Sequence, residues 1–168
     1  DSFGIVDPGI EEKDWNYKTI VYNTVIDEGG GNVKQTDRGE IALRAIRTAK
    51  EEGLKTVAVY TEPDKYARFV EAADTAIALN PQLSPVAAYL DCQGLIDVAK
   101  QTNAQMVHPG YGFLSENPDF AKACENNGIT LVGPTSQQME QLGNKTEARL
   151  IAEACGVPII PGTNHAIN

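Results

Sequence analysis

Cysteine, histidine, tryptophan and long apolar runs are all scarce in this sequence. The three cysteines, Cys92, Cys124 and Cys155, are unclustered, and there is no Cys-x-x-Cys or Cys/His pair, so we expect no metal or redox site. Each lies on the apolar face of a predicted helix, which favours buried thiols in a reducing compartment, either cytoplasm or mitochondrial matrix. The longest apolar runs, such as residues 19–26, are far shorter than the ~18 residues needed for a membrane span, and no signal peptide is evident.

Basic residues are also in short supply, with 14 lysines and arginines against 23 aspartates and glutamates. The resulting net charge of −9 argues against nonspecific binding to nucleic acid or to anionic membranes. A local basic site for a phosphate is still compatible with this balance. The length of 168 residues suits one domain with a single sizeable core.

Short apolar runs alternate with helical patterns after residue 38, which predicts an α/β fold with a Rossmann-like parallel sheet and helices on both faces. The expected strands, each buried on both faces, are residues 57–60, 76–79, 105–108 and 129–132. The expected helices begin near Ile41, Ser84, Asn117, Ser136 and Thr146. The helix from Ser84 is expected to run on to Ala99 without a break. Glycines 29–31 lack the Gly-x-Gly-x-x-Gly spacing, so a nicotinamide-binding domain is the weakest interpretation.

Residues 108–117 (HPGYGFLSEN) are the most informative segment. They follow an apolar strand, and Gly110 and Gly112 permit positive φ angles or close approach of another group to the backbone. Asn117 before Pro118 is the pattern of an N-cap with proline at the first helical position. Strand, glycine loop and capped helix together place ligands at the carboxyl end of a parallel strand. We call residues 108–117 the HPGYG loop.

Several further motifs accompany this loop in a fixed order: RGEIA at 38–42 with Arg44, TVAVY at 56–60, GP at 133–134, GNK at 143–145, and GVP at 156–158 leading to PG at 161–162. With them, residues 38–163 resemble the N-terminal domain of biotin carboxylase, found in acetyl-CoA, propionyl-CoA, pyruvate and urea carboxylases. The resemblance implies a complete ligase that makes carboxybiotin from bicarbonate, ATP and biotin, with Mg²⁺. The family's ATP-grasp lid and main catalytic residues lie beyond the matched region, so we expect this chain to be the first of three subdomains and not catalytic alone.

The domain organisation that we predict has three parts. Residues 38–163 form the biotin carboxylase-like domain, and residues 164–168 lead toward the ATP-grasp region. Residues 1–37 depart from the family because a polar, glycine-rich segment precedes Arg38. One alignment makes residues 17–23 the family's first strand, followed by an insertion; another makes residues 32–37 a degraded strand. We prefer the first, because residues 19–26 are the only strong β-forming run there.

The resemblance assigns candidate roles to four residues. Tyr111 and Gly112 match a pair that faces the pocket for biotin and bicarbonate, although a tight turn with a packed tyrosine is the structural alternative. Lys145 matches a lysine that contacts the ATP phosphates, and an exposed lysine without a partner is its alternative. In bacterial relatives this domain contributes to dimerisation, so the resemblance makes Arg44 a candidate interface residue. No catalytic residue and no metal ligand is assigned within the chain.

Two neighbouring residues of the loop receive structural interpretations. A buried, hydrogen-bonded imidazole is favoured for His108 over a catalytic base. Glu116 is expected to hold the loop or to cap the following helix.

Two functions compete at this point. In the first, the chain is the N-terminal subdomain of a biotin carboxylase. Its partners are then the remaining carboxylase domains, a biotin carboxyl carrier domain and a carboxyltransferase, with ATP, Mg²⁺ and biotin bound by the complete enzyme but none of them tightly by this chain. In the second, it is a noncatalytic structural or interaction subunit of the same ancestry. A homodimer or a larger complex fits both.

Overall fold

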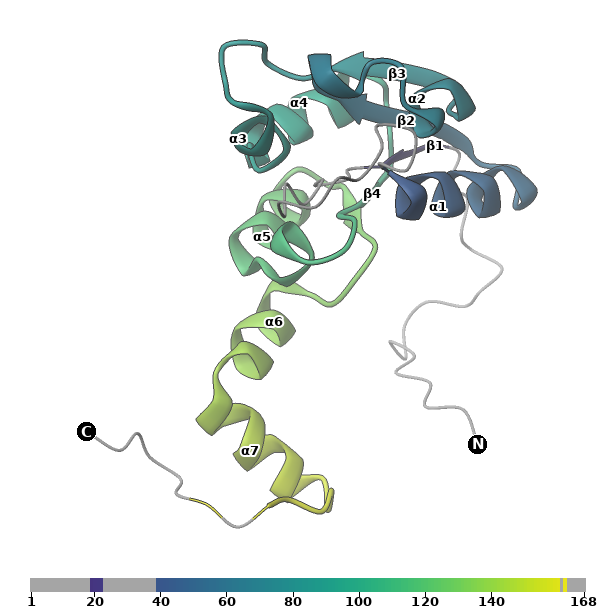
Figure 1. The fold of residues 1–168 in the computed structure, drawn as a ribbon. Helices are drawn as coiled ribbons and strands as arrows, with labels where there is room; N and C mark the ends of the chain where they lie inside the picture. The colour runs from purple at the N-terminus through teal and green to yellow at the C-terminus, as the bar shows by residue number, and fades with distance from the viewer. Residues whose placement is uncertain (1–18, 23–38, 161, 163–168) are drawn as a thin grey trace, which may run out of the picture.

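The computed structural model describes residues 19–22, 39–160 and 162. Within these described residues, five parallel strands form one sheet in the order β3-β2-β1-β4-β5 (Figure 1). The strands are β1 (Thr19–Tyr22), β2 (Lys55–Tyr60), β3 (Thr75–Ala78), β4 (Met106–His108) and β5 (Thr130–Leu131). The helices are α1 (Glu40–Glu51), η3 (Glu62–Asp64), α2 (Arg68–Ala72), α3 (Pro85–Tyr89), α4 (Cys92–Gln101), η4 (Phe113–Glu116), α5 (Pro118–Asn126), α6 (Ser136–Gly143) and α7 (Lys145–Ala154). The predicted α/β class, with a parallel sheet and helices on both faces, is confirmed.

The alternation of side chains along β2 divides the core between the two faces of the sheet. Val57 and Val59 pack into the larger cluster, which also receives residues of α3, α4 and α5. Ala58 points to the opposite face, where it packs with Ile46 of α1 and Phe69 of α2. Successive side chains of a strand point to opposite faces, so a strand buried on both faces is apolar throughout.

The strand expected within residues 19–26 is present at Thr19–Tyr22, in the middle of the sheet. It pairs with β2 on one side and with β4 on the other. Residues 23–26, the glycine-rich segment and Arg38 lie outside the described residues. Val21, which is fully buried, pairs with Val57 and Val107.

Several sequence predictions were wrong in detail. The strands β3 and β5 are not buried on both faces, because they are the two edges of the sheet. The single helix expected from Ser84 to Ala99 is two helices, because the Asp91 side chain accepts a hydrogen bond from the backbone amide of Gly94 and so caps a new helix, α4. Ile41 is exposed, and Ala42 takes the buried position on α1.

A group of polar side chains, which we call the polar junction, links α1, β2 and β3 at the point where β2 begins. The Asp74 carboxylate accepts hydrogen bonds from the Thr56 amide at 2.9 Å and from the Thr56 hydroxyl at 2.8 Å, and it lies 3.2 Å from the Lys50 ammonium group. Partial burial raises the pKa of Asp74, but these hydrogen bonds and the Lys50 charge outweigh it and bring the pKa to about 2. The junction therefore joins α1, β2 and the start of β3 through one ionised carboxylate.

The helices α6 and α7 extend from the sheet as an arm, which we call the α6–α7 arm (Figure 1). Ser136 attaches it to α5, because its amide and hydroxyl both donate to the Glu125 carboxylate at 2.8 Å. No residue of α7 is buried, so Cys155 at its end is exposed and the prediction of a buried thiol there is wrong. Cys124 is buried as predicted, and Cys92 is partly buried.

Candidate functional site

The direction of the chain through the sheet determines where a ligand site belongs. From β1 the chain proceeds outward through β2 to β3, and it then returns to the other side of β1 to form β4 and β5. The order of strands therefore reverses between β1 and β4, where Tyr22 pairs with His108. In open parallel sheets, ligands bind outside the carboxyl ends of the strands at such a switch point. The HPGYG loop begins there, at the end of β4.

The backbone of the HPGYG loop is held in conformations that few residues adopt. Gly110 has φ 83°, and Gly112 has φ 70° with ψ −168°, a combination essentially restricted to glycine. A Cβ built on Gly112 would meet nothing within 4 Å. Glycine is therefore required here by the backbone conformation. A side chain at this position would not clash with the described residues. Leu114 is buried and anchors the turn to the core.

The start of α5 has the predicted cap. The Asn117 side chain accepts hydrogen bonds from the amides of Asp119 at 2.9 Å and Phe120 at 3.1 Å, with Pro118 at the first helical position. Glu116 is exposed, and the side-chain cap of α5 is Asn117, as expected. The loop is thus fixed at both ends, by β4 and by α5.

Between these two ends the loop presents both apolar and polar groups to solvent. Tyr111 is 79% exposed, so the alternative in which this tyrosine packs over the sheet does not describe the structure. Within the described part of the chain, the amides of Tyr111, Gly112 and Phe113 donate no hydrogen bond to the protein. Free N–H groups beside an exposed aromatic ring can bind a ligand that has both polar and apolar parts.

His108 is partly buried, and its imidazole is hydrogen-bonded as expected from the sequence. Its Nδ1 atom accepts a hydrogen bond from the Gly110 amide at 3.1 Å, which fixes the first turn of the loop. Burial lowers the pKa of His108, so the imidazole is neutral at pH 7 and can accept this bond. The side chain therefore shapes the loop.

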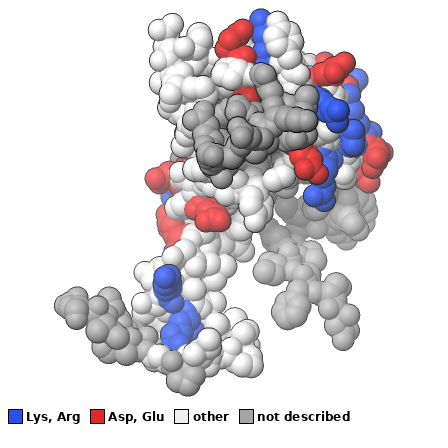
Figure 2. All heavy atoms as spheres, viewed as in Figure 1, with Lys and Arg blue, Asp and Glu red and all other residues white. Residues whose placement is uncertain are grey.

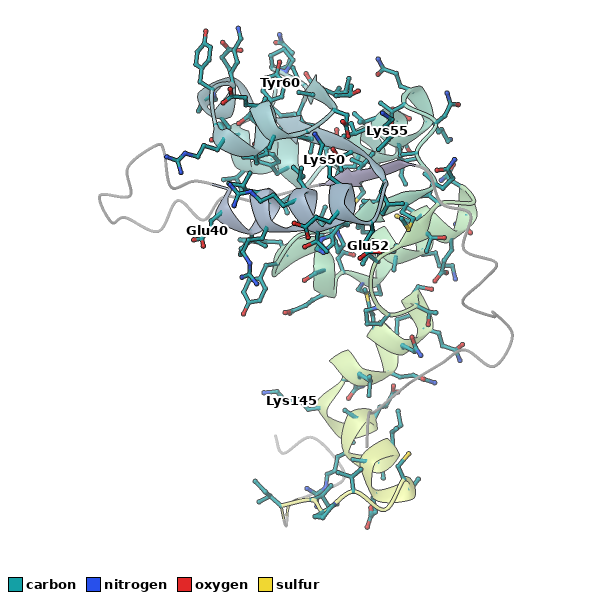
Figure 3. The ribbon with its side chains drawn as sticks, turned by 90° about the vertical axis from the view of Figure 1, so that its right-hand side faces the viewer. Glu40, Lys50, Glu52, Lys55, Tyr60 and Lys145 are labelled. Carbon is teal, nitrogen blue, oxygen red and sulfur yellow. The ribbon has the colours of Figure 1, made fainter. Side chains whose placement is uncertain are left out.

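Lys145 lies far from the HPGYG loop. It is the first residue of α7, exposed, at the point where α6 meets α7, and the α6 helix separates it from the body of the sheet (Figure 3). The Asn144 side chain caps α7 by accepting from the amides of Thr146 and Glu147 at 3.0 and 3.4 Å. No contact between Lys145 and either Tyr111 or Gly112 is present among the described residues.

Arg44 is not part of this site. It is exposed on α1, and among the described residues it forms no ion pair. Its surroundings are charged, since α1 and the residues around it carry many of the acidic and basic side chains (Figures 2 and 3). Its role at an interface, implied by the resemblance, stays a prediction.

A buried polar network at the end of β2 was not predicted from sequence. The Tyr89 hydroxyl donates to Oδ2 of Asp64 at 2.8 Å and accepts from the Thr61 amide at 3.2 Å. The Thr61 hydroxyl donates to the same oxygen at 2.9 Å. Burial, followed by the negative charge of Asp64, raises the pKa of Tyr89, so the hydroxyl keeps its proton. Tyr89 looked like one more apolar position of a helix, and no sequence signal links it to Asp64.

Metal ligands are not grouped in the described part of the chain. No three His, Cys, Asp or Glu side chains among these residues lie close enough together to hold an ion. The described residues therefore do not fit a Mg²⁺ site of their own. No helix among them is both long and apolar enough to cross a membrane.

Comparison with known protein families identifies the family to which the loop and the sheet belong. Residues 32–139 match the profile of the biotin carboxylase N-terminal domain. The chain belongs to this family. The resemblance inferred from the motifs is confirmed, and the match ends before the α6–α7 arm is complete.

The relatives of this biotin carboxylase N-terminal domain include proteins much longer than this chain. It is 48% identical over 136 residues to the mitochondrial pyruvate carboxylase of Rattus norvegicus, covering 81% of this chain and 12% of that protein. It is 51% identical over 127 residues to the urea amidolyase of Saccharomyces cerevisiae, covering 76% and 7%. The chain thus spans about a tenth of the length of these relatives.

A solved structure supports the same assignment. The biotin carboxylase domain dimer of Hydrogenobacter thermophilus 2-oxoglutarate carboxylase, in complex with MgADP and bicarbonate, matches with a TM-score of 0.74 and 37% identity. The match covers 88% of this chain and 29% of that one. The arrangement of strands and helices is therefore that of a biotin carboxylase domain, and the larger part of such a domain lies outside the matched region.

Proposed function

We propose that this chain is the N-terminal part of an ATP-dependent biotin carboxylase and supplies one wall of the pocket where biotin and bicarbonate meet. The observation that supports this most is the HPGYG loop. It lies at the switch point of a biotin carboxylase-type sheet, with an exposed Tyr111 and with backbone amides that donate to no group of the described residues. The complete enzyme would use ATP and Mg²⁺ to carboxylate biotin with bicarbonate.

The residues of the loop fit biotin. The amides of Tyr111 and Gly112, which donate to no described residue, can donate to the carbonyl oxygen of a urea group, and the tyrosine ring offers apolar surface to the rest of the ligand. The rigid attachment of the loop to β4 and α5 keeps these groups in place before a ligand arrives. Such preorganisation lowers the entropic cost of binding.

Lys145 fits ATP only as one contact among several. It is an exposed cation at a helix start, where an anion would offset the unfavourable interaction of its charge with the helix dipole. Its distance from the loop means that the nucleotide would lie between the α6–α7 arm and parts of the enzyme outside this chain. We therefore expect weak ATP binding by the chain alone and no turnover, since phosphoryl transfer depends on positioned metal ions and several phosphate contacts.

The proposed partners follow from this division of the site. They are the remaining biotin carboxylase domains, a carrier domain that presents biotin, and a carboxyltransferase. A homodimer through the face that bears Arg44 is a further part of the proposal. The compartment would be the cytoplasm or the mitochondrial matrix.

The decisive experiment uses the native polypeptide that contains this sequence. Its intact mass is determined, and bicarbonate-dependent ATP hydrolysis is measured with and without free biotin. Hydrolysis that biotin stimulates is the expected result. A native product of about this length that is inactive and copurifies with other subunits would overturn the proposal in favour of a noncatalytic structural subunit.

The phosphate contact is tested in the same polypeptide by comparing Lys145→Ala with Lys100→Ala. Lys100 is also exposed, but it lies in the last turn of α4, just before β4. We expect Lys145→Ala to raise the KM for ATP several-fold and Lys100→Ala to leave it unchanged. Equal ATP affinities in both variants would remove Lys145 from the nucleotide site.

A further inference from the structure

The α6–α7 arm is joined to the body of the domain at its first residue. Ser136 begins α6 and is buried, with 6% of its surface exposed. Its backbone amide and its hydroxyl both donate to the Glu125 carboxylate near the end of α5, one to each oxygen, at 2.8 Å. Glu125 therefore supplies the acceptor for two donors of a buried residue.

The side-chain caps of α6 and α7 lie within the arm. Thr135 and Gln138 form a capping box at the start of α6. Asn144 caps α7. These bonds hold the helices of the arm but do not relate the arm to the sheet. The contact between Glu125 and Ser136 does, because its acceptor lies on α5 and its donors lie on α6.

Apolar packing alone would not set the direction of the arm. The helix α6 packs against α5, and its Met139 is buried, whereas no residue of α7 is buried (Figure 1). Apolar contacts are nondirectional, so a helix held by them alone can tilt at little cost. Hydrogen bonds depend on both distance and angle, so two bonds to one carboxylate define an orientation. The Glu125 carboxylate is thus the directional part of the attachment.

The charge of Glu125 strengthens this contact. The hydrogen bond from the Ser136 amide, and then the one from its hydroxyl, lower the pKa of Glu125, so the side chain stays ionised at pH 7. Hydrogen bonds to an ionised acceptor are shorter and stronger than those to a neutral one. The negative charge also lies at the start of α6, where the helix dipole favours an anion.

The direction of the arm determines where Lys145 lies, because this residue is carried by the arm at the start of α7 (Figure 3). We propose that Glu125 is a positioning residue for the nucleotide site, whose carboxylate sets the direction of the arm and thereby the place of Lys145. This inference rests on the proposed function, in which Lys145 contacts the ATP phosphates. A displacement of about 1 Å is enough to weaken such a contact.

The test uses the full-length polypeptide and its bicarbonate-dependent ATP hydrolysis stimulated by free biotin. Glu125→Gln keeps the length of the side chain and an acceptor oxygen, whereas Glu125→Asp keeps the charge but is one methylene shorter. We expect Glu125→Asp and Glu125→Ala to raise the KM for ATP several-fold, with the KM for biotin unchanged. Glu125→Gln should stay close to the wild type, because its side chain still reaches Ser136.

The matched control is Glu140→Ala, which removes an exposed carboxylate from the same arm, and both KM values should stay unchanged. Ser136→Ala is a milder variant, since it loses the hydroxyl donor and keeps the amide. It should raise the KM for ATP less than Glu125→Ala does, and it keeps the test open where Glu125→Ala does not fold. No rise in either Ser136→Ala or Glu125→Asp would overturn the inference.

A double-mutant cycle shows whether Glu125 acts through Lys145. In a Lys145→Ala background, Glu125→Ala should raise the KM for ATP no further, because the side chain that it positions is already gone. Effects of the two substitutions that multiply would contradict this. So would an effect that follows charge instead of reach, with Glu125→Gln impaired and Glu125→Asp normal.

A structural defect has a different result. Kinetics are measured well below the thermal midpoint of each variant, and a rise of both KM values in Glu125→Asp would assign Glu125 to folding and overturn the inference. A wild-type polypeptide without biotin-stimulated hydrolysis overturns the proposed function, and the role of Glu125 with it. An active wild type in which Lys145→Ala raises the KM for ATP and the Glu125 variants do not overturns the role of Glu125 alone.

Discussion

The residue before α1, Gly39, is required both by its backbone conformation and by the lack of space for a side chain, so its substitution tests the fold. Gly39 has φ +78°, and a Cβ added to it would lie 2.2 Å from Cδ1 of Phe69. Phe69 is fully buried and packs in the cluster beneath α1 and α2. A Gly39→Ala substitution would therefore strain the backbone and also force an aromatic ring to move in a packed core.

The two effects can be estimated separately. A non-glycine residue in the left-handed region costs about 1–2 kcal/mol, and overpacking a core costs about 1–3 kcal/mol more. We expect Gly39→Ala to lower the free energy of unfolding by about 2–5 kcal/mol, a large part of the roughly 5–15 kcal/mol of a typical domain. The matched control is Gly53→Ala after the other end of α1, where φ is +77° and a Cβ would meet nothing within 4 Å.

Equilibrium urea unfolding of the chain, followed by circular dichroism, measures the difference. Gly53→Ala should cost only the backbone term, about 1–2 kcal/mol, and Gly39→Ala should unfold at a clearly lower urea concentration. Adding Phe69→Leu to Gly39→Ala should recover part of the loss, because the smaller side chain makes room. Equal destabilisation by the two glycine substitutions would refute the predicted clash.

Three further predictions concern polar groups. The pKa of Asp74 is about 2 in the folded chain, below its ordinary value of 3.8, so its ionised form stabilises the fold above pH 4 and this contribution is lost as the pH falls from 4 to 2. In the Asp74→Asn variant, the free energy of unfolding should therefore change less between pH 4 and pH 2 than in the wild type, by about 1 kcal/mol after allowance for solvent screening. Tyr89→Phe should cost about 1.5–3 kcal/mol in urea unfolding, because a buried hydrogen bond to a carboxylate is lost, whereas the exposed Tyr66→Phe should cost nothing measurable. Asn144→Ala should speed hydrogen exchange across α7, which has no buried residue to hold it, whereas Asn117→Ala should leave the buried α5 amides protected; equal protection of α7 in wild type and Asn144→Ala would contradict this.

The sequence was most informative where one residue type has one structural use. The cap at Asn117, the positive φ of Gly112 and the apolar strand β2 were all predictable, because each depends on local backbone chemistry or on a simple burial pattern. The position of β1 between β2 and β4 also agrees with the only strong β-forming run near the start of the chain.

What could not be predicted depends on residues distant in sequence. Nothing near Tyr89 indicates that its hydroxyl meets Asp64, and nothing near Gly39 indicates that Phe69 lies against it. The exposure of Cys155 follows from the position of α7 outside the core, which periodicity alone does not show, since an amphipathic helix looks the same whether or not its apolar face is covered.

The central position of β1 also has a consequence for how the chain folds. Among the described strands β1 is made first, yet both of its neighbours, β2 and β4, come later, and β4 follows β2 only after four further helical segments. During synthesis β1 therefore has an open edge until the chain has grown past His108, and such edges promote misassociation. Completion of the sheet coincides with the emergence of the HPGYG loop, so a polypeptide interrupted before that point lacks both the loop and the pairing that protects its first strand.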